Sequence, residues 1–465
     1  MATPQDSPYL YNEPFAPNKK PQEDPVEIKL VEGQFPQDIV GTYYRNGPNP
    51  VYEPPGLYHW FDGDGCIHAV RLANGVATYV ARQVETHKLK TEKSAGKSLY
   101  GGFRSKPKLQ NFLDYYFKGL PLFPDVSNTD LIAHNSKLYS VCAPLGQVYE
   151  VDPLTLQTVS TQNFNGQLKN LVAAHSKLDP HTNEIVFYGF DASPLSFGKP
   201  KIYHNVVSRD GLLVKSTALK IERPKNMHDF AITQNHTVFF DQPLEITLKG
   251  LEFKPTVPSR MGILPRHGNS KDVRWIEMPA DYIIHTGNAF EKDSDHIVIY
   301  ACDVEGLNDP SRDEKYLKFG SYYTRWTLDI RNLKLVEKTR LMAEAVEFPS
   351  INESFLTREN QYSYCARFDE NSKFYEFDAL VKYDHKTNQK LVYEFGGERR
   401  GNEFCFAPRK ESQKEDDGYL VGYVLDKAKH KSEFLVIQAH DMRLAARFEI
   451  PTRVPSGFHG LWRQH

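Results

Sequence analysis

The 465-residue chain is poor in cysteine, in net charge and in long apolar runs. Its cysteines are odd in number and include no C-x-x-C pair, which argues against a disulfide framework or a cysteine zinc site. They are Cys66, Cys142, Cys302, Cys365 and Cys405. A net charge of −2 indicates no nucleic-acid partner. No stretch reaches about 18 apolar residues, and the first residues lack the apolar run of a signal peptide. We therefore expect a cytoplasmic protein.

Strong helical periodicity is also scarce, and Gln110–Lys118 is the best helical candidate. Short β-branched or aromatic runs alternate instead with polar turns, as in Tyr322–Ile330 and Leu333–Thr339. Such hairpins continue along the chain without a linker, which predicts one all-β domain over residues 1–465. A propeller of about seven blades would fit at roughly 40–65 residues per blade, although the repeats are too degenerate to count.

Four of the 17 histidines share a distinctive context. His175, His228, His285 and His459 have small or apolar neighbours and stand beside predicted strand ends. Their spacings of 53, 57 and 174 residues suit ligands from different blades that point toward a propeller axis. Imidazole binds iron, copper, nickel and zinc, so the pattern predicts a metal site without choosing the metal. The other histidines are expected to be structural, with His134 in an exposed loop.

These four contexts resemble the ligand motifs of the carotenoid cleavage oxygenase family. Further matches lie at Tyr44–Pro50, His59–Gly65 and Gly262–Arg266. The match is specific, because independent motifs follow one another in the family's order along nearly the whole chain. The resemblance implies a seven-bladed β-propeller with Fe(II) on its axis. It also implies a cap of loops and helices, expected around residues 90–125 and in loops between blades.

The resemblance further implies that four imidazoles hold Fe(II), that no organic cofactor is needed, and that O2 cleaves a conjugated double bond into two carbonyl products. Two other functions are compatible with the same fold. One is a retinoid-type isomerohydrolase, whose branch is longer and less similar. The other is an inactive propeller that serves as a binding module, against which the intact histidines argue.

Glu347 and Glu403 match two of the three glutamates with which the family orients its ligand histidines. The third position departs from the pattern. Around Cys142 and Ala143 the chain has neither an acid nor the lysine typical of the stilbene- and phenylpropene-cleaving branch. We therefore expect one ligand histidine to lack a carboxylate partner, with altered metal affinity or redox behaviour.

The chain is most similar to this lignostilbene and phenylpropene branch, in which a tyrosine and that lysine grip a 4-hydroxyl group of the substrate. Phe103 stands where the tyrosine is expected. Loss of both grips predicts a substrate without a free 4-hydroxyl, such as an apocarotenoid, another conjugated polyene or an O-alkylated aryl alkene. Tyr100 is a second candidate for a hydroxyl contact, and Thr129 and Phe61 complete the expected substrate and O2 pocket.

The helical candidate and the residues after it are rich in aromatic and aliphatic side chains. Phe112, Tyr115, Tyr116 and Leu120 would form an apolar face. This face either packs a cap helix on the propeller or forms a tunnel lip that dips into a membrane and collects lipophilic substrate. Little basic charge accompanies the face, which favours the packed helix over peripheral membrane contact.

Overall fold

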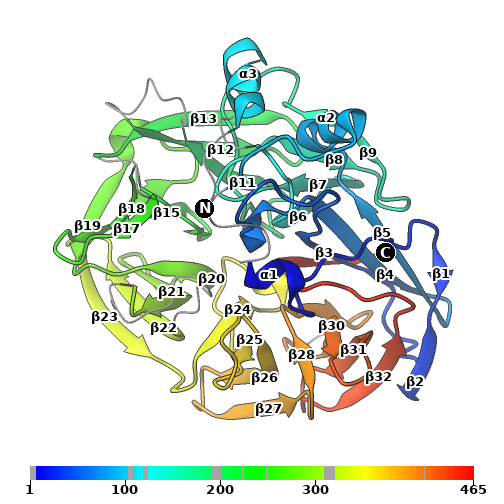
Figure 1. The fold of residues 1–465 in the computed structure, drawn as a ribbon. Coiled ribbons are helices and arrows are strands. Elements are labelled where there is room, and N and C mark those ends of the chain that lie inside the picture. Colours follow the sequence, from blue (N-terminus) through cyan, green and yellow to red (C-terminus); the bar gives the residue numbers. More distant parts are fainter. Residues whose placement is uncertain are drawn as a thin grey trace.

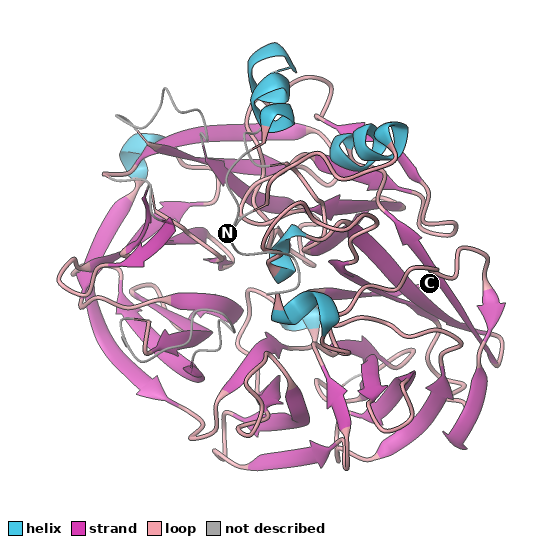
Figure 2. Ribbon diagram, in the orientation of Figure 1, coloured by secondary structure: helices cyan, strands magenta, loops and turns pink. Residues whose placement is uncertain are grey.

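The computed structural model describes residues 7–102, 108–118, 124–190, 200–222, 225–247, 250–307, 320–412 and 414–465. Within them, antiparallel strands form seven blades in a ring, which Figure 1 shows as a progression of colour around the centre. Strands dominate, and the few helices lie at the periphery and over the centre of the ring (Figure 2). The predicted β-propeller is therefore confirmed.

Each blade contains four principal strands, named in order from the centre outward. The first blade comprises β33 (Gly460–Gln464), β3 (Gly41–Pro48), β4 (Gly65–Ala73) and β5 (Val76–Gln83). The second comprises β6 (Asp130–His134), β7 (Lys137–Val141), β8 (Val148–Val151) and β9 (Thr158–Gln162). The third comprises β10 (Lys177–Leu178), β11 (Ile185–Phe190), β12 (Lys201–Val207) and β13 (Leu213–Lys220). The fourth and fifth comprise β14 (Phe230–Ile232), β15 (His236–Asp241), β18 (Ser259–Pro265) and β19 (Arg274–Met278); and β20 (Ile283–Glu291), β21 (His296–Glu305), β22 (Gly320–Asp329) and β23 (Lys334–Arg340). The last two comprise β24 (Val346–Ser350), β25 (Tyr362–Phe368), β26 (Phe377–Asp384) and β27 (Lys390–Glu394); and β29 (Cys405–Pro408), β30 (Gly418–Asp426), β31 (Lys431–Gln438) and β32 (Leu444–Glu449).

The two ends of the chain close the ring. The last strand, β33, pairs with β3, so the C-terminus completes the first blade. In the N-terminal segment, β1 (Val26–Glu27) pairs with β5 of the first blade and β2 (Lys29–Gly33) pairs with β32 of the seventh. A short strand, β28 (Arg399–Gly401), pairs with both β26 and β30 and joins the last two blades. A hairpin of β16 (Leu244–Thr247) and β17 (Gly250–Phe253) extends the fourth blade.

Apolar side chains fill the spaces between neighbouring blades. Successive residues of a strand point to opposite faces of its sheet, so each blade buries both faces against its neighbours. Separate clusters of buried residues lie at each of the seven junctions, including that between the seventh and the first blade. At this last junction Tyr43 and Val70 of the first blade pack with Phe434 of the seventh. The ring is thus closed by packing as well as by β33.

Helices are few and short. Those in the described residues are α1 (Pro8–Tyr11), α2 (His87–Ala95) and α3 (Leu109–Lys118), with single 3-10 turns at η2 (Trp60–Asp62), η4 (Ser270–Asp272) and η5 (Glu353–Phe355). The helix predicted at Gln110–Lys118 is confirmed as α3. No described helix has the length and apolar character needed to cross a bilayer.

Helix α2 was missed because its sequence carries almost no apolar stripe. The residues that cap this helix could nevertheless have been recognised from the sequence. The hydroxyl of Thr86 accepts from the backbone N–H of Leu89 at 3.1 Å, and Gly96 ends the helix with a left-handed φ of 67°.

Candidate metal centre

Inner strands bring the four predicted histidines to the centre of the ring. His175 lies two residues before β10, His228 lies two residues before β14, His285 is the third residue of β20, and His459 directly precedes β33. The four rings therefore come from the third, fourth, fifth and first blades. The 53-, 57- and 174-residue spacings thus reflect one position repeated in four blades.

The ring nitrogens converge. The Nε2 atom of His228 lies 3.1 Å from Nε2 of His175 and 3.1 Å from Nε2 of His285. The ring of His459 has its centroid 4.6 Å from that of His175 and 4.8 Å from that of His285. Two nitrogens bound at right angles through bonds of about 2.1 Å lie about 3.0 Å apart, against about 3.4 Å at the tetrahedral angle. The donor set therefore fits a metal ion whose ligands stand at right angles, and its imidazoles suit iron, copper, nickel or zinc.

Burial controls the charge of these imidazoles. Burial, together with neighbouring histidines, holds the pKa of His175 well below its usual value and lowers the pKa of His228 and His285 to about 3. His459 behaves differently. Burial lowers its pKa, but the carboxylates of Glu403 and other nearby acids outweigh that effect and raise it to about 9. Three of the four rings are thus already in the neutral form that binds metals.

Carboxylates contact two of the rings at their Nδ1 atoms. Oε2 of Glu347, which is buried, lies 2.5 Å from Nδ1 of His285. Oε1 of Glu403 lies 3.1 Å from Nδ1 of His459, and its other oxygen accepts from the N–H of Gly460. Such contacts fix the tautomer of a ring and leave Nε2 free to face a metal. Both glutamates predicted for this role therefore lie beside a histidine of the cluster.

Across the described ranges, no carboxylate hydrogen-bonds to the ring of His175 or His228. At the position where the sequence departs from the family pattern, Cys142 is buried and its thiol donates to the carbonyl of Ala143 at 3.3 Å. The position itself therefore carries a thiol and a methyl group in place of an acid or an amine, as the sequence predicted.

Two of the predicted pocket residues lie close to His459. The carbonyl of Thr129 accepts from the backbone N–H of His459 at 3.1 Å, and its hydroxyl accepts from the N–H of Ala143 at 3.0 Å. Phe61, 41% exposed, has its ring centroid 5.3 Å from that of Phe458, the residue before His459. An accessible aromatic ring therefore packs against the residue that precedes a histidine of the cluster.

The other two predicted pocket residues fall in the segment 90–125, where the sequence predicted a cap. Tyr100 is buried, and its hydroxyl donates to the carboxylate of Asp114 in α3. That hydroxyl is thus engaged within the cap, which weakens its candidacy for a substrate contact. Phe103 lies outside the described residues.

Helix α3 buries polar side chains and exposes apolar ones. Its buried side chains are polar: Asn111 accepts from the N–H of Gly101 at 3.0 Å, and Asp114 accepts from Gln110 and Tyr100. Its apolar side chains are exposed instead, and they are Leu109, Phe112, Leu113, Tyr116 and Phe117. The tunnel-lip prediction included Phe112 and Tyr116 but missed Leu109, Leu113 and Phe117. The side chain of Tyr115 and all of Leu120 lie outside the described parts of the chain.

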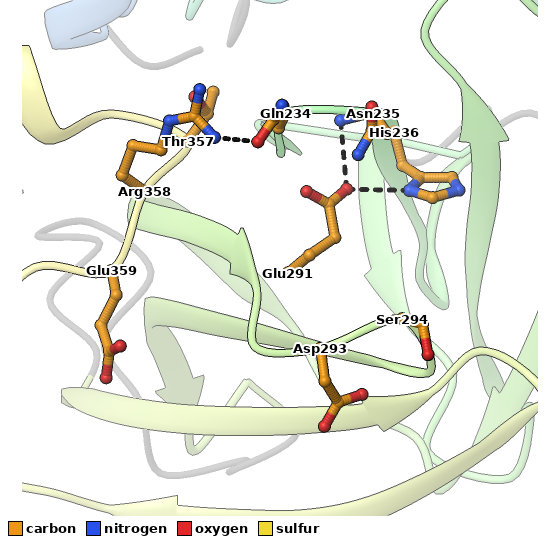
Figure 3. A pocket seen from close by; sticks show the side chains of 9 residues that line it. All are labelled: Gln234, Asn235, His236, Glu291, Asp293, Ser294, Thr357, Arg358 and Glu359. Carbon is orange, nitrogen blue, oxygen red and sulfur yellow. Dashed lines mark hydrogen bonds and ion pairs between the residues drawn. The ribbon is translucent and has the colours of Figure 1, made fainter.

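A separate pocket of about 310 Å³ opens where the inner strands of the fourth and fifth blades end, at the opposite end of those strands from His228 and His285. Figure 3 shows Glu291 in it, hydrogen-bonded to His236 and to the backbone of Asn235. All of its lining residues are polar or charged, and Asp293 and Glu359 add further carboxylates. A lipophilic alkene would find no apolar wall here, so the pocket is no candidate for the substrate site.

The structure adds two carboxylates that the sequence did not single out. Asp130 accepts from the backbone N–H of His175 at 3.0 Å, and Asp229 lies directly after His228. The usable signals were that Asp229 directly follows a ligand candidate and that Asp130 directly follows Thr129, a predicted pocket residue. The prediction for His134 was wrong: it ends β6, is buried, and its Nε2 lies 3.0 Å from the carbonyl oxygen of Asn183.

Comparison with known proteins points to one family. The family model described as retinal pigment epithelial membrane protein (RPE65) matches residues 15–464. Carotenoid 9,10(9',10')-cleavage dioxygenase 1 of Arabidopsis thaliana is 32% identical, over 96% of this chain and 88% of that protein. Isoeugenol monooxygenase of Pseudomonas nitroreducens is 29% identical, over 93% of each.

Solved structures agree. The crystal structure of Pseudomonas brassicacearum lignostilbene dioxygenase covers the whole of both chains with a TM-score of 0.88 and 26% identity. The similar proteins thus include a carotenoid cleavage dioxygenase, an isoeugenol monooxygenase and a lignostilbene dioxygenase. The chain belongs to the RPE65, or carotenoid cleavage oxygenase, family of alkene-cleaving dioxygenases.

Proposed function

We propose that this protein is an Fe(II) dioxygenase that cleaves one conjugated carbon–carbon double bond with O2. Both oxygen atoms of O2 enter the products, so that R–CH=CH–R′ and O2 give R–CHO and R′–CHO. The observation that carries the proposal is the convergence of four imidazoles: Nε2 of His228 lies 3.1 Å from Nε2 of His175 and of His285, and the ring of His459 has its centroid 4.6 Å from that of His175. Such an all-nitrogen set differs from the two-histidine-one-carboxylate sites of other iron oxygenases.

The residues would divide the work in a simple way. His175, His228, His285 and His459 would hold the iron, and Glu347 and Glu403 would orient two of these rings. Bound Fe(II) would supply activation of O2 beside the alkene. Phe61 would offer a flat apolar surface for the alkene, and the backbone of Thr129 would hold His459 in place. Residues 1–465 would act as one domain.

For the substrate we favour a carotenoid, apocarotenoid or aryl alkene without a free 4-hydroxyl. A phenol buried in a pocket needs a hydrogen-bond partner, because an unpaired buried hydroxyl costs about 1–3 kcal/mol. The residues that would provide that partner in the aryl-alkene branch are replaced by Phe103 and by Cys142 or Ala143. Tyr100 does not restore the grip, since its hydroxyl is bound to Asp114.

Helix α3 would be the lip through which lipophilic substrate reaches the pocket. Phe117 is 82% exposed and Tyr116 75% exposed, on a helix that buries the polar residues Asn111 and Asp114. Contiguous exposed apolar side chains of this kind mark contact with a lipid surface or a lipophilic ligand. We favour peripheral membrane contact over a purely packed cap helix on this ground.

Oxygen consumption tests the proposal. The protein, reconstituted with Fe(II) under anaerobic conditions, is mixed with aerated buffer and a panel of apocarotenals, stilbenes and phenylpropenes. We expect one O2 consumed per alkene and two aldehydes whose masses locate the cleaved bond, with no turnover in His285→Ala. Product formation without O2 uptake would contradict the proposal and favour an isomerohydrolase. No turnover of any alkene by the iron-loaded protein would favour a binding module.

A further inference from the structure

A buried carboxylate lies next to the histidine cluster with every oxygen engaged. Asp229 is 1% exposed, and its Oδ1 accepts from the N–H of Phe230 at 2.7 Å and pairs with Nζ of Lys177 at 2.9 Å. Its Oδ2 accepts from both the backbone N–H and the hydroxyl of Thr286, each at 2.7 Å. Nζ of Lys177 also lies 3.2 Å from Oδ2, so this carboxylate holds an amine, a hydroxyl and two backbone N–H groups.

The partners of this carboxylate come from three blades. Lys177 follows His175 by two residues, Asp229 follows His228 directly, and Thr286 follows His285 directly. One side chain therefore links the inner strands of the third, fourth and fifth blades at the level next to the imidazoles. It does so through charge-assisted hydrogen bonds, which are shorter and stronger than neutral ones.

Two of these three histidines have little other support at the ring. Glu347 holds the ring of His285, whereas in the part of the chain that the structure describes neither His175 nor His228 has a carboxylate at its ring. The places of those two rings thus depend on the backbone that carries them. A shift of the backbone by a few tenths of an ångström would change the Nε2 spacing on which a metal depends.

We propose that Asp229 is a positioning residue that sets the spacing of His175, His228 and His285 and thereby the strength and symmetry of the metal site. The inference rests on the proposed function, because it concerns the same metal. It goes further in assigning to one carboxylate the role that the missing third glutamate leaves open.

Asp229→Asn is the first test. An amide offers a single acceptor oxygen, so either Thr286 or the N–H of Phe230 loses its acceptor, and Lys177, which contacts both carboxylate oxygens, loses the opposite charge. Thr286→Val is milder, since it removes only the hydroxyl donor. Asp241→Asn is the matched control. Asp241 is also buried and lies in β15 of the same blade, and its ion-pair partners are Lys225, at 2.8 Å, and Arg260, neither of which is a ligand histidine or a partner of Asp229.

Fe(II) affinity is measured anaerobically by chelator competition, and Co(II) is loaded as a spectroscopic probe of ligand geometry. We expect Asp229→Asn to weaken iron binding about 10–100-fold and to shift the Co(II) ligand-field bands, as loss of an outer partner does. Thr286→Val should show a smaller loss, and Asp241→Asn should keep wild-type affinity and bands even where its melting temperature falls.

Folded Asp229→Asn with wild-type affinity and an unchanged Co(II) spectrum would overturn the inference. If that variant does not fold, wild-type affinity and bands in Thr286→Val would overturn it. Equal losses in Asp241→Asn would also overturn it, because they would reveal general destabilisation. A wild-type protein that binds no iron would instead refute the proposed function itself.

Discussion

Substitution of Glu347 by glutamine removes the negative charge next to His285 but keeps the hydrogen bonds that position the side chain at residue 347. Oε2 of Glu347 accepts from Nδ1 of His285 and from the N–H of Phe348, both at 2.5 Å, and Oε1 accepts from the hydroxyl of Ser321 at 3.2 Å. The carbonyl of glutamine takes the first two donors, and its amide nitrogen donates to Ser321, whose hydroxyl is also an acceptor. Geometry is thus kept while a negative charge is removed.

The neutral glutamine at position 347 makes His285 a weaker base toward a metal. Loss of such a partner costs about 10–100-fold in metal affinity, equivalent to about 1.4–2.7 kcal/mol. Burial raises the pKa of Glu347 to about 7, so the wild-type carboxyl is charged above pH 7 and becomes protonated as the pH falls through 7. Protonated glutamate resembles glutamine, so the affinity gap between wild type and Glu347→Gln should narrow as the pH is lowered.

Anaerobic chelator competition for Fe(II) at pH 8 and at pH 6 measures this gap. We expect a clear deficit for Glu347→Gln at pH 8 and a smaller one at pH 6, with an unchanged circular dichroism spectrum. Equal affinities at pH 8 would refute the reasoning, and so would a deficit that persists undiminished at pH 6.

Three further predictions concern the second glutamate, the cap and the pocket. Glu403→Gln should weaken iron binding more than Glu347→Gln, because both oxygens of Glu403 accept N–H donors and an amide nitrogen would face one of them; a smaller loss, measured in the same competition assay, would contradict this. Phe117→Ser should reduce flotation with liposomes while leaving the melting temperature nearly unchanged, since an 82% exposed side chain contributes within about 0.5 kcal/mol to stability; wild-type protein that never floats would disprove the lip. A 4-hydroxystilbene should be turned over no faster than its 4-methoxy analogue, and a large preference for the phenol in kcat/KM would sink the proposed substrate class.

The sequence predicted most of the fold because its signals were local. Hairpins such as Tyr322–Ile330 with Leu333–Thr339 appear as β22 and β23, nearly residue for residue. The closure of the ring was beyond such reasoning, because the pairing of Gly41–Arg45 with Gly460–Gln464 joins segments more than 400 residues apart. Patterns of alternation reveal that a strand exists and which face is apolar, but not its partner.

For the site, residue contexts and the family resemblance selected four histidines whose rings converge in the structure, and two glutamates, Glu347 and Glu403, that contact two of those rings. Relations that exist only in three dimensions were missed. Asp229 gains its meaning from Lys177 and Thr286, which are 52 and 57 residues away. Only part of the exposed apolar face of α3 was predicted. Helical periodicity shows that a helix has an apolar face, but it does not show that the polar face, with Asp114, is the one that is buried.

Crystallography at the iron absorption edge tests the central claim most directly. Anomalous differences collected from crystals of the Fe(II)-loaded protein locate iron without any assumption about activity. We predict a single strong peak within bonding distance of Nε2 of His175, His228, His285 and His459. No peak there, or a peak bound by fewer than the four rings or by a carboxylate in place of one, would contradict the account.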